Sequence, residues 1–180
     1  MNIDLNERQA DSTLKLALRM QSAGAGATLN VRDYDLGVFF NFATYDPPFG
    51  IASALLSSGQ TSVLRNSSLR AALGRWPAAI ADGVEDQLML HEISTTRIQP
   101  LLENSVENMQ PVHASYTEET VHIDYSRAIL NTKSDIIVSQ ELWNVLFHHY
   151  ARNLVTLSDL ELTGIQLTEL IDLVAQELGD

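Results

Sequence analysis

The C-terminal segment 139–178 carries an apolar stripe long enough to constrain the whole fold. Residues that are apolar or suited to a helix interface follow one another at alternating steps of four and three: Leu142, Leu146, His149, Asn153, Leu157, Leu160, Gly164, Leu167, Ile171, Val174 and Leu178. This spacing places them on one face of an α-helix. Such a helix would be about 60 Å long at 1.5 Å per residue. A compact domain of 180 residues has a radius of gyration of roughly 16 Å, so the helix would project from it.

The ends of this helix are marked by capping residues. Ser139 suits the N-cap, and Glu141 lies in the first turn, where the helix dipole favours a carboxylate. An alternative is a break at 156–159, because Ser158 and Glu161 have capping-box spacing. We favour the continuous helix, because the stripe passes through the possible break in phase.

Composition excludes several classes of function. The hydrophobic fraction of 45% and the charged fraction of 19% are values of a globular chain, and we expect one domain over 1–180. Eleven basic and 23 acidic residues give a net charge of −12, which repels nucleic acids and anionic membranes. The absence of cysteine excludes disulfides, thiol catalysis and thiolate metal sites.

Membrane and export signals are missing from the chain as written. No apolar run reaches the roughly 18 residues needed to span a bilayer. The N-terminal residues lack the basic start and continuous apolar core of a signal peptide. We therefore expect this chain to be soluble.

The segment 44–87 is dense in signals that start and end helices. Asp46 suits an N-cap, and the two prolines that follow it lack the N–H group that a first helical turn leaves unsatisfied. Apolar residues then recur at helical spacing as far as Leu56, and Gly59 suits the left-handed residue that ends a helix.

A second and a third helix are expected in the same segment. Asn66 can cap the second, and the pair Trp76–Pro77 is expected to break it and to open the third, because the residue before proline is disfavoured in the α region. The third helix would run over 77–108, with a kink or an end near Pro100. Together these signals predict a compact helical corner with Trp76 as its largest apolar anchor.

The remaining segments complete a mostly helical pattern. We expect an amphipathic helix over 4–21, a break of small residues at 22–26 and a short aromatic-rich helix over 33–43 packed under the corner. Residues 110–138 predict mostly irregular chain, with the alternation at 121–125 typical of a short edge strand.

The predicted fold class is all-α. We expect an irregular bundle of about six to eight helices, in which the two long helices over 77–108 and 139–178 are antiparallel. The predicted core contains Trp76, Leu55, Leu56, Phe39, Leu88, Leu142, Leu146 and Phe147.

Two histidine motifs suggest metal chemistry at first sight. Side chains of the adjacent His148 and His149 point about 100° apart on a helix, so they cannot share an ion, and a packed or interfacial pair is the preferred interpretation. Glu119 and His122 match the Glu-x-x-His element of di-metal bundles, but the second copy of that element is missing. We expect no metal and no cofactor.

An acidic group and an aromatic group are the other candidates. Asp82, Glu85 and Asp86 share a helical face, which is best explained as a solvated face paired with Arg75 or Arg97. Six aromatic residues could line a ligand pocket, although core packing is the preferred interpretation. They are Phe39, Phe40, Phe42, Tyr45, Phe49 and Trp76. No nucleophile elbow and no phosphate loop is present.

One part of the chain resembles a bacterial family of unknown function. The similarity rests on six motifs and, more loosely, on the end of the C-terminal helix at Ala175-Gln176-Glu177-Leu178. The six motifs are Tyr45-Asp46-Pro47-Pro48-Phe49-Gly50, Ala54-Leu55-Leu56-Ser57-Ser58-Gly59-Gln60, Leu64-Arg65-Asn66, Leu69-Arg70-Ala71-Ala72-Leu73, Trp76-Pro77 and Glu85-Asp86-Gln87. The family pattern is aromatic-Asp-Pro, Leu-Ile-Ser-Ser-Gly, Leu-Arg-Asp and a helix with acidic residues. The resemblance implies an N-terminal membrane helix after a short basic segment, which would place the domain in the periplasm. This chain lacks that segment, and the family supplies no catalytic residues.

Two functional hypotheses follow. The first is a non-catalytic interaction or sensory domain, tethered to the inner membrane in a longer protein. The alternative is a small-molecule-binding or hydrolytic domain that uses the aromatic cluster near Asp46 and Trp76 with Glu85 and Asp86. The candidate binding surface comprises Tyr45, Asp46, Trp76, Asp82, Glu85, Asp86, His148 and His149.

The stripe over 157–178 predicts a partner for the chain. We expect a second copy to cover it, as a symmetric dimer, because an apolar stripe in water is unfavourable. The competing outcome is that the N-terminal helix folds back and covers the stripe within one chain.

Overall fold

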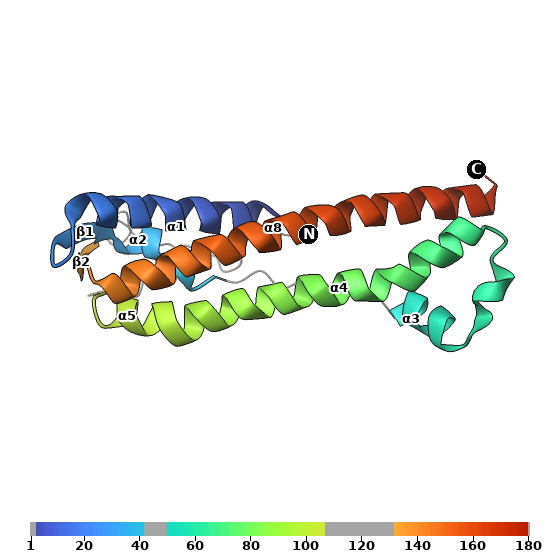
Figure 1. Cartoon of the computed structure of the whole chain (residues 1–180), viewed down its shortest axis with the longest axis horizontal. Coiled ribbons are helices and arrows are strands. Elements are labelled where there is room, and N and C mark those ends of the chain that lie inside the picture. The colour runs from blue at the N-terminus through green and yellow to red at the C-terminus, as the bar shows by residue number, and fades with distance from the viewer. Residues whose placement is uncertain (1–2, 42–49, 107–131, 180) are drawn as a thin grey trace.

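The computed structural model describes residues 3–41, 50–106 and 132–179, and these form an elongated, mostly helical molecule (Figure 1). The elements in chain order are α1 (Ile3–Ala23), β1 (Thr28–Arg32), α2 (Asp33–Leu36), a 3-10 turn (Gly37–Phe39), α3 (Gly50–Ser57), a 3-10 turn (Gln60–Val63), α4 (Ser67–Ile93), a π-helical turn (Ser94–Ile98), α5 (Gln99–Glu103), β2 (Lys133–Ile137) and α8 (Gln140–Leu178).

The molecule divides into a body and an arm. We call residues 3–41, 81–106 and 132–160 the body, where α1 and α4 both lie along α8 (Figure 1). We call residues 50–80 and 161–178 the arm, where α4 is the main neighbour of α8 among the described residues and α3 lies near the bend of α4 (Figure 1). The long helices α4 and α8 are antiparallel, as the sequence predicted.

The C-terminal helix is continuous. The side chain of Ser139 accepts a hydrogen bond from the backbone N–H of Leu142 at 3.0 Å, which confirms the predicted N-cap. The helix runs without a break from Gln140 to Leu178 and ends at Gly179, whose φ of 86° is left-handed. The alternative break at 156–159 was wrong.

The other long helix differs from its prediction. Asn66 caps it as expected, because its side chain accepts from the N–H groups of Ser68 and Leu69. The expected break at Trp76–Pro77 was wrong, because α4 continues through Pro77 and only bends in this part of its course (Figure 1). Packing of Trp76 against the end of α8 holds the helix on both sides of the proline.

The predicted end of this helix at 108 was also wrong. After α4 the chain forms the π-helical turn and then α5, and this run of helical residues ends at Glu103. Pro100 lies in the first turn of α5, where its missing N–H group is tolerated. The π-helical turn, with Pro100 in the first turn of α5, therefore takes the place of the kink that was predicted near Pro100.

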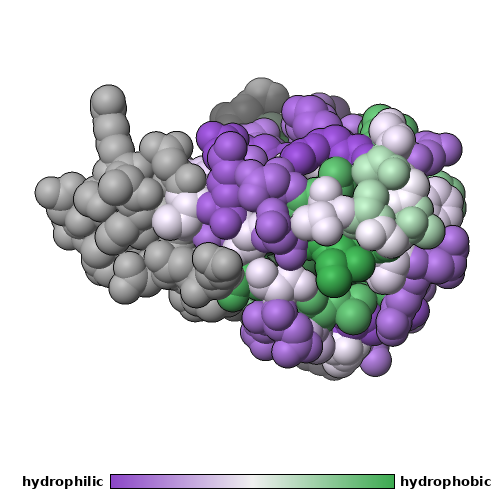
Figure 2. Space-filling model, turned by 90° about the vertical axis from the view of Figure 1, so that its left-hand side faces the viewer, coloured by the Kyte–Doolittle hydropathy of each residue, from purple (hydrophilic) through white to green (hydrophobic). Residues whose placement is uncertain are grey.

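A two-stranded antiparallel sheet closes one end of the body, which corrects the all-α prediction to mostly α. β1 pairs with β2 from Thr28 opposite Ile137 to Arg32 opposite Lys133. Gly24 and Gly26 make the turn into β1 with left-handed φ angles of 84° and 82°. Seen from this end, the surface shows an apolar region bordered by hydrophilic residues (Figure 2).

The sheet is attached to the helices by a buried carboxylate. Asp33, at the start of α2, is fully buried, and its two carboxylate oxygens accept from the hydroxyls of Ser134 (2.6 Å) and Thr132 (2.7 Å). The N–H of Asp33 also donates to the carbonyl of Thr132 at 3.0 Å. These bonds fix β2 against α2.

The body and the arm have separate apolar cores. The body core has thirteen buried residues: Leu16, Met20, Val31, Leu36, Phe39, Ile93, Ile98, Leu102, Ile136, Val138, Leu142, Val145 and Leu146. The arm core has four: Leu69, Ala72, Trp76 and Leu170. The aromatic segment that begins at Asp33 therefore packs in the body and not under the helical corner, which lies in the arm.

Four of the eight predicted core residues are buried: Trp76, Phe39, Leu142 and Leu146. Leu55 and Leu56 are half-buried. The prediction that Leu88 and Phe147 lie in the core was wrong, since 64% and 55% of their surfaces are exposed. The inward side of α4 carries Gly83, Asp86 and Leu90 instead, so a buried acid occupies the place where the pattern predicted leucine.

Some predictions concern residues outside those described. These are the helix start at Asp46, the aromatic Tyr45, the strand at 121–125 and the pair Glu119 and His122. The count of six to eight helices stays a prediction for the same reason.

Candidate interaction surface

One side of α8 changes from buried to exposed along its length. Leu146, Asn153, Leu160, Leu167 and Val174 are seven residues apart and so lie on the same side of the helix. The first three are fully buried, whereas Leu167 and Val174 are 43% and 42% exposed. Ile171 and Leu178, which adjoin them at helical spacing, are 61% and 74% exposed. We call Leu167, Ile171, Val174 and Leu178 the uncovered stripe.

The end of α1 explains this change. Thr13 of α1 meets His149 of α8 at 3.1 Å, and α1 runs antiparallel to α8 (Figure 1). Ile3 lies ten residues before Thr13, about 15 Å along the helix axis, which is the level of residue 159 on α8. Beyond that level no described segment covers this side of α8.

The part of α8 that α1 covers carries both apolar and polar residues. Leu142, Val145 and Leu146 share the body core with Leu16 and Met20 of α1, and His149, Asn153 and Thr156 are buried further along α8. Nδ1 of His149 lies 3.1 Å from Oγ1 of Thr13 and 3.3 Å from Nδ2 of Asn153. The uncovered stripe, in contrast, consists of aliphatic residues alone.

His149 is held neutral by its surroundings. Phe39 packs edge-on against its ring at 5.7 Å between centroids. Burial, with a contribution from the neighbouring His148, lowers the pKa of His149 to about 4. His148 is exposed and points away from this interior. The adjacent histidines are thus separated, as the helix geometry predicted.

The three acidic residues of α4 are separated as well. Asp82 and Glu85 are exposed, but Asp86 is buried and its Oδ1 accepts from Nη2 of Arg152 on α8 at 2.5 Å. Its ion-pair partner is therefore neither Arg75 nor Arg97. Burial and a hydrogen bond with Asp159 raise the pKa of Asp86 to about 6, and Arg152 opposes this rise.

Among the described residues of the predicted binding surface, Trp76 and Asp86 lie in different regions of the molecule. Trp76 lies in the arm core, ten residues and about 15 Å along α4 from Asp86. Within 3–41, 50–106 and 132–179, no three histidine or acidic side chains gather closely enough to hold a metal ion.

At the far end of the arm, polar contacts join the end of α8 to the start of α4. The two carboxylate oxygens of Glu177, near the end of α8, accept from the backbone N–H groups of Arg65 and Asn66 at 2.6 Å each. These bonds lower the pKa of Glu177. Glu177 thereby fixes the end of α8 to the start of α4.

A second exposed apolar row lies on the outer side of α8, and the sequence analysis missed it. Phe147, Leu154, Leu162 and Ile165 are each about half exposed or more. Trp143 stacks on Phe147 with 5.6 Å between ring centroids. The signal was available, because these residues also recur at helical spacing, but the stronger inner stripe led to Phe147 being assigned to the core. Around 160–171, α8 is therefore apolar on more than the side that faces α4.

Comparisons with known proteins give no relatives. The chain matches no protein-family model, no curated protein and no solved structure. None of the described helices has both the length and the apolarity that crossing a membrane requires. Anchoring to the inner membrane, which the family resemblance implies, stays a prediction that an upstream reading frame with a membrane helix would support.

Proposed function

We propose that this chain is a non-catalytic helical interaction domain that pairs with a second copy of itself through the arm. The observation that carries the proposal is the uncovered stripe, whose four aliphatic side chains are 42–74% exposed on the same side of α8 that is buried at Leu146, Asn153 and Leu160. A helix that is apolar on more than one side is typical of a buried helix. Among the described residues, the cover of α8 in the arm comes mainly from α4.

A second copy fits the geometry of the arm. In the body, α1 occupies the third position beside α4 and α8, and no described helix occupies this position along the arm. The arm of a second copy, related by a two-fold axis, would run antiparallel to α8 and so in the direction of α1. It would occupy the open position over 161–178, about 27 Å of helix, and the two arms would form a four-helix arrangement.

The driving force is apolar burial. Removing apolar surface from water contributes about 25 cal/mol per Å². Each half-exposed aliphatic side chain of the stripe would therefore contribute on the order of 1 kcal/mol. Eight such side chains in the pair give several kcal/mol to oppose the entropic cost of association. A symmetric pair buries the stripes of both copies at once, which a partner on only one copy does not.

Charge provides a check on the identity of the partner. Glu161, Glu169 and Asp172 flank the stripe and are exposed. In a self-paired arm these acidic residues lie near their own copies, and salt screens that repulsion. A second copy should therefore bind more tightly as the salt concentration rises, whereas a basic partner would bind more weakly.

Matched variants of the full chain test the proposal by analytical ultracentrifugation at high micromolar concentration. The stripe variant carries Leu167→Glu and Ile171→Glu. The control carries Leu162→Glu and Ile165→Glu, with the same added charge on the outer row of the same helix. We expect dimers for the unmodified chain and the control, and monomers for the stripe variant.

Two results would overturn the proposal. One is an unmodified chain that stays monomeric across the concentration range. The other is equal dissociation of both variants, which would show that added charge and not the stripe controls association. Circular dichroism of each variant establishes that the helices are intact.

A further inference from the structure

A cavity in the body combines an apolar floor with cationic side chains at its mouth. It has a volume of about 490 Å³ and lies between α1, β1 and α2. Ligand pockets in proteins typically have about 300–1,000 Å³. The floor is formed by the buried side chains of Leu16, Val31, Leu36 and Phe39. This cavity lies in the body and is independent of the arm pairing proposed above.

Positive charge is concentrated here in a chain that is strongly acidic. Lys15, Arg19 and Arg32 line the cavity, although the chain has only 11 basic residues against 23 acidic ones. Asp35 is the acidic residue among the described residues of the lining. The cavity therefore differs in sign from the chain as a whole.

The three cations differ in their availability. Arg32 makes two bonds with Asp35, from Nε at 2.9 Å and from Nη2 at 2.7 Å, which neutralises it. Lys15 contacts Asp11 in a pair that is largely exposed, and such pairs contribute little stability. The ammonium group of Lys15 can therefore turn toward a ligand with little loss.

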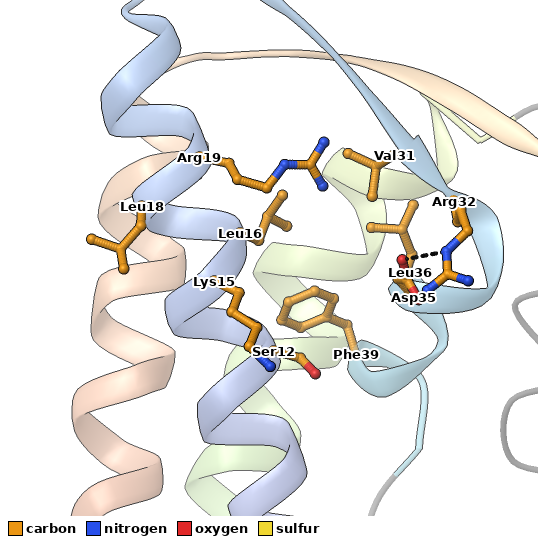
Figure 3. A pocket seen from close by; sticks show the side chains of 10 residues that line it. All are labelled: Ser12, Lys15, Leu16, Leu18, Arg19, Val31, Arg32, Asp35, Leu36 and Phe39. Atoms are coloured by element: carbon orange, nitrogen blue, oxygen red, sulfur yellow. Dashed lines mark hydrogen bonds and ion pairs between the residues drawn. The ribbon is translucent and has the colours of Figure 1, made fainter.

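Arg19 is the cation without a carboxylate. Its Nη2 donates to the carbonyl of Asn30 on β1 at 2.9 Å, and among the described residues it forms no ion pair. Figure 3 shows Arg19 extending from α1 toward Val31, with Leu16 and the ring of Phe39 pointing into the space beside it. The carbonyl of Asn30 orients the guanidinium group and leaves other N–H donors for a ligand.

We propose that this cavity binds a small amphipathic carboxylate, with its apolar body against Leu16 and Phe39 and its carboxylate on Arg19. Guanidinium and carboxylate groups form two parallel hydrogen bonds, which makes arginine a specific partner for this head group. The apolar floor supplies the area that holds a short alkyl or aryl body. Lys15 adds a second cation on the same face of α1.

Decanoate and its neutral counterpart decanol are suitable probes, each titrated into the full chain with chemical shifts followed by NMR. We expect decanoate to shift the amides of 12–19 and 31–39 in a saturable way. Arg19→Gln should weaken decanoate binding about tenfold or more and leave decanol binding unchanged. Arg8→Gln is the matched control, because Arg8 is an exposed arginine of α1 outside the cavity.

The outcomes separate clearly. Ser12→Phe places a ring in the cavity and should abolish the binding of both probes, which locates the apolar body. Equal weakening by Arg8→Gln and Arg19→Gln would overturn the proposal, because it would reflect overall charge alone. Absence of saturable shifts in the unmodified chain would also overturn it. None of these variants alters the arm, so self-association provides an independent check that the chain remains intact.

Discussion

The body and the arm use the same helix in opposite ways. In the body, α8 lies between α1 and α4 and its inner side is fully buried, although that side carries His149, Asn153 and Thr156. In the arm, the cover of α8 among the described residues comes mainly from α4, and the uncovered stripe is exposed although Leu170 packs against α4. Coverage by α1 thus includes the buried polar residues of α8 and ends before the uncovered stripe.

The difference shows that specific polar contacts determine the register of α1. Thr13 and His149 are in hydrogen-bonding distance, and Gln9 donates to the carbonyl of Val38 at 3.1 Å and to that of Asn41. These groups are buried, and moving α1 toward the arm would leave them without partners, which is unfavourable. The apolar stripe of the arm is thereby left for another chain.

The largest difference in unfolding free energy between the body and the arm should come from substitutions in their apolar cores. Leu146→Ala removes a fully buried side chain of the body core and should lower the free energy of unfolding by about 2–5 kcal/mol. Leu170→Ala removes a slightly exposed side chain of the much smaller arm core, so its cost should be at the lower end of that range. Urea denaturation followed by circular dichroism measures both.

Hydrogen exchange measures in which region Leu170→Ala reduces stability. Leu170→Ala should reduce amide protection over 67–80 and 161–178 and leave the body protected, because stability varies between cooperative units. The exposed Leu154→Ala serves as the control and should change stability by less than about 0.5 kcal/mol. Equal losses of protection in body and arm for Leu170→Ala would contradict the division into two regions.

The next effect concerns the polar interior of the body. His149 has a pKa of about 4 in the folded chain against 6.5 when exposed. As pH falls from 7 to 4, the unfolded chain takes up a proton that the folded chain refuses, so stability is lost over this range. The loss should reach about 3 kcal/mol at 1.36 kcal/mol per pKa unit.

His149→Gln isolates this dependence. Asp86, with a pKa raised to about 6, works in the opposite direction, because its protonation favours the folded chain. The difference between the unmodified chain and the variant cancels that contribution. His148→Gln is the control and should retain the loss of stability below pH 6.5. An unmodified pH profile in His149→Gln would show that this ring is not the titrating group.

The sequence predicted the long helices better than what lies between them. Ser139, Asn66 and Gly59 act locally, through the first or last turn of one helix, so their roles were evident from composition and spacing. Pro77 was misjudged, because packing on both sides keeps α4 helical there. β1 and β2 were missed, since each is five residues long and their pairing joins segments about a hundred residues apart.

The candidate surfaces divide in the same way. The uncovered stripe followed from periodicity alone, because it lies on a single helix. The cavity at Arg19 was not predicted, since it needs α1, β1 and α2, which lie apart in the sequence, to meet in the fold. The spacing of residues within one element does not show which elements pack together.

The smallest effect should come from the closure of the arm. Glu177→Gln removes the charge that accepts the N–H groups of Arg65 and Asn66 and should speed exchange of those two amides, with little change in the unfolding of the body. Because the pKa of Glu177 is lowered in the folded chain, its stabilising effect is present above the ordinary glutamate range and is lost as pH falls through the folded value. Glu169→Gln is the control, because its 4.0 Å pair with Arg75 is exposed and such pairs contribute little. If both variants leave these amides unchanged, the closure of the arm depends on Trp76 and Leu170 and not on Glu177.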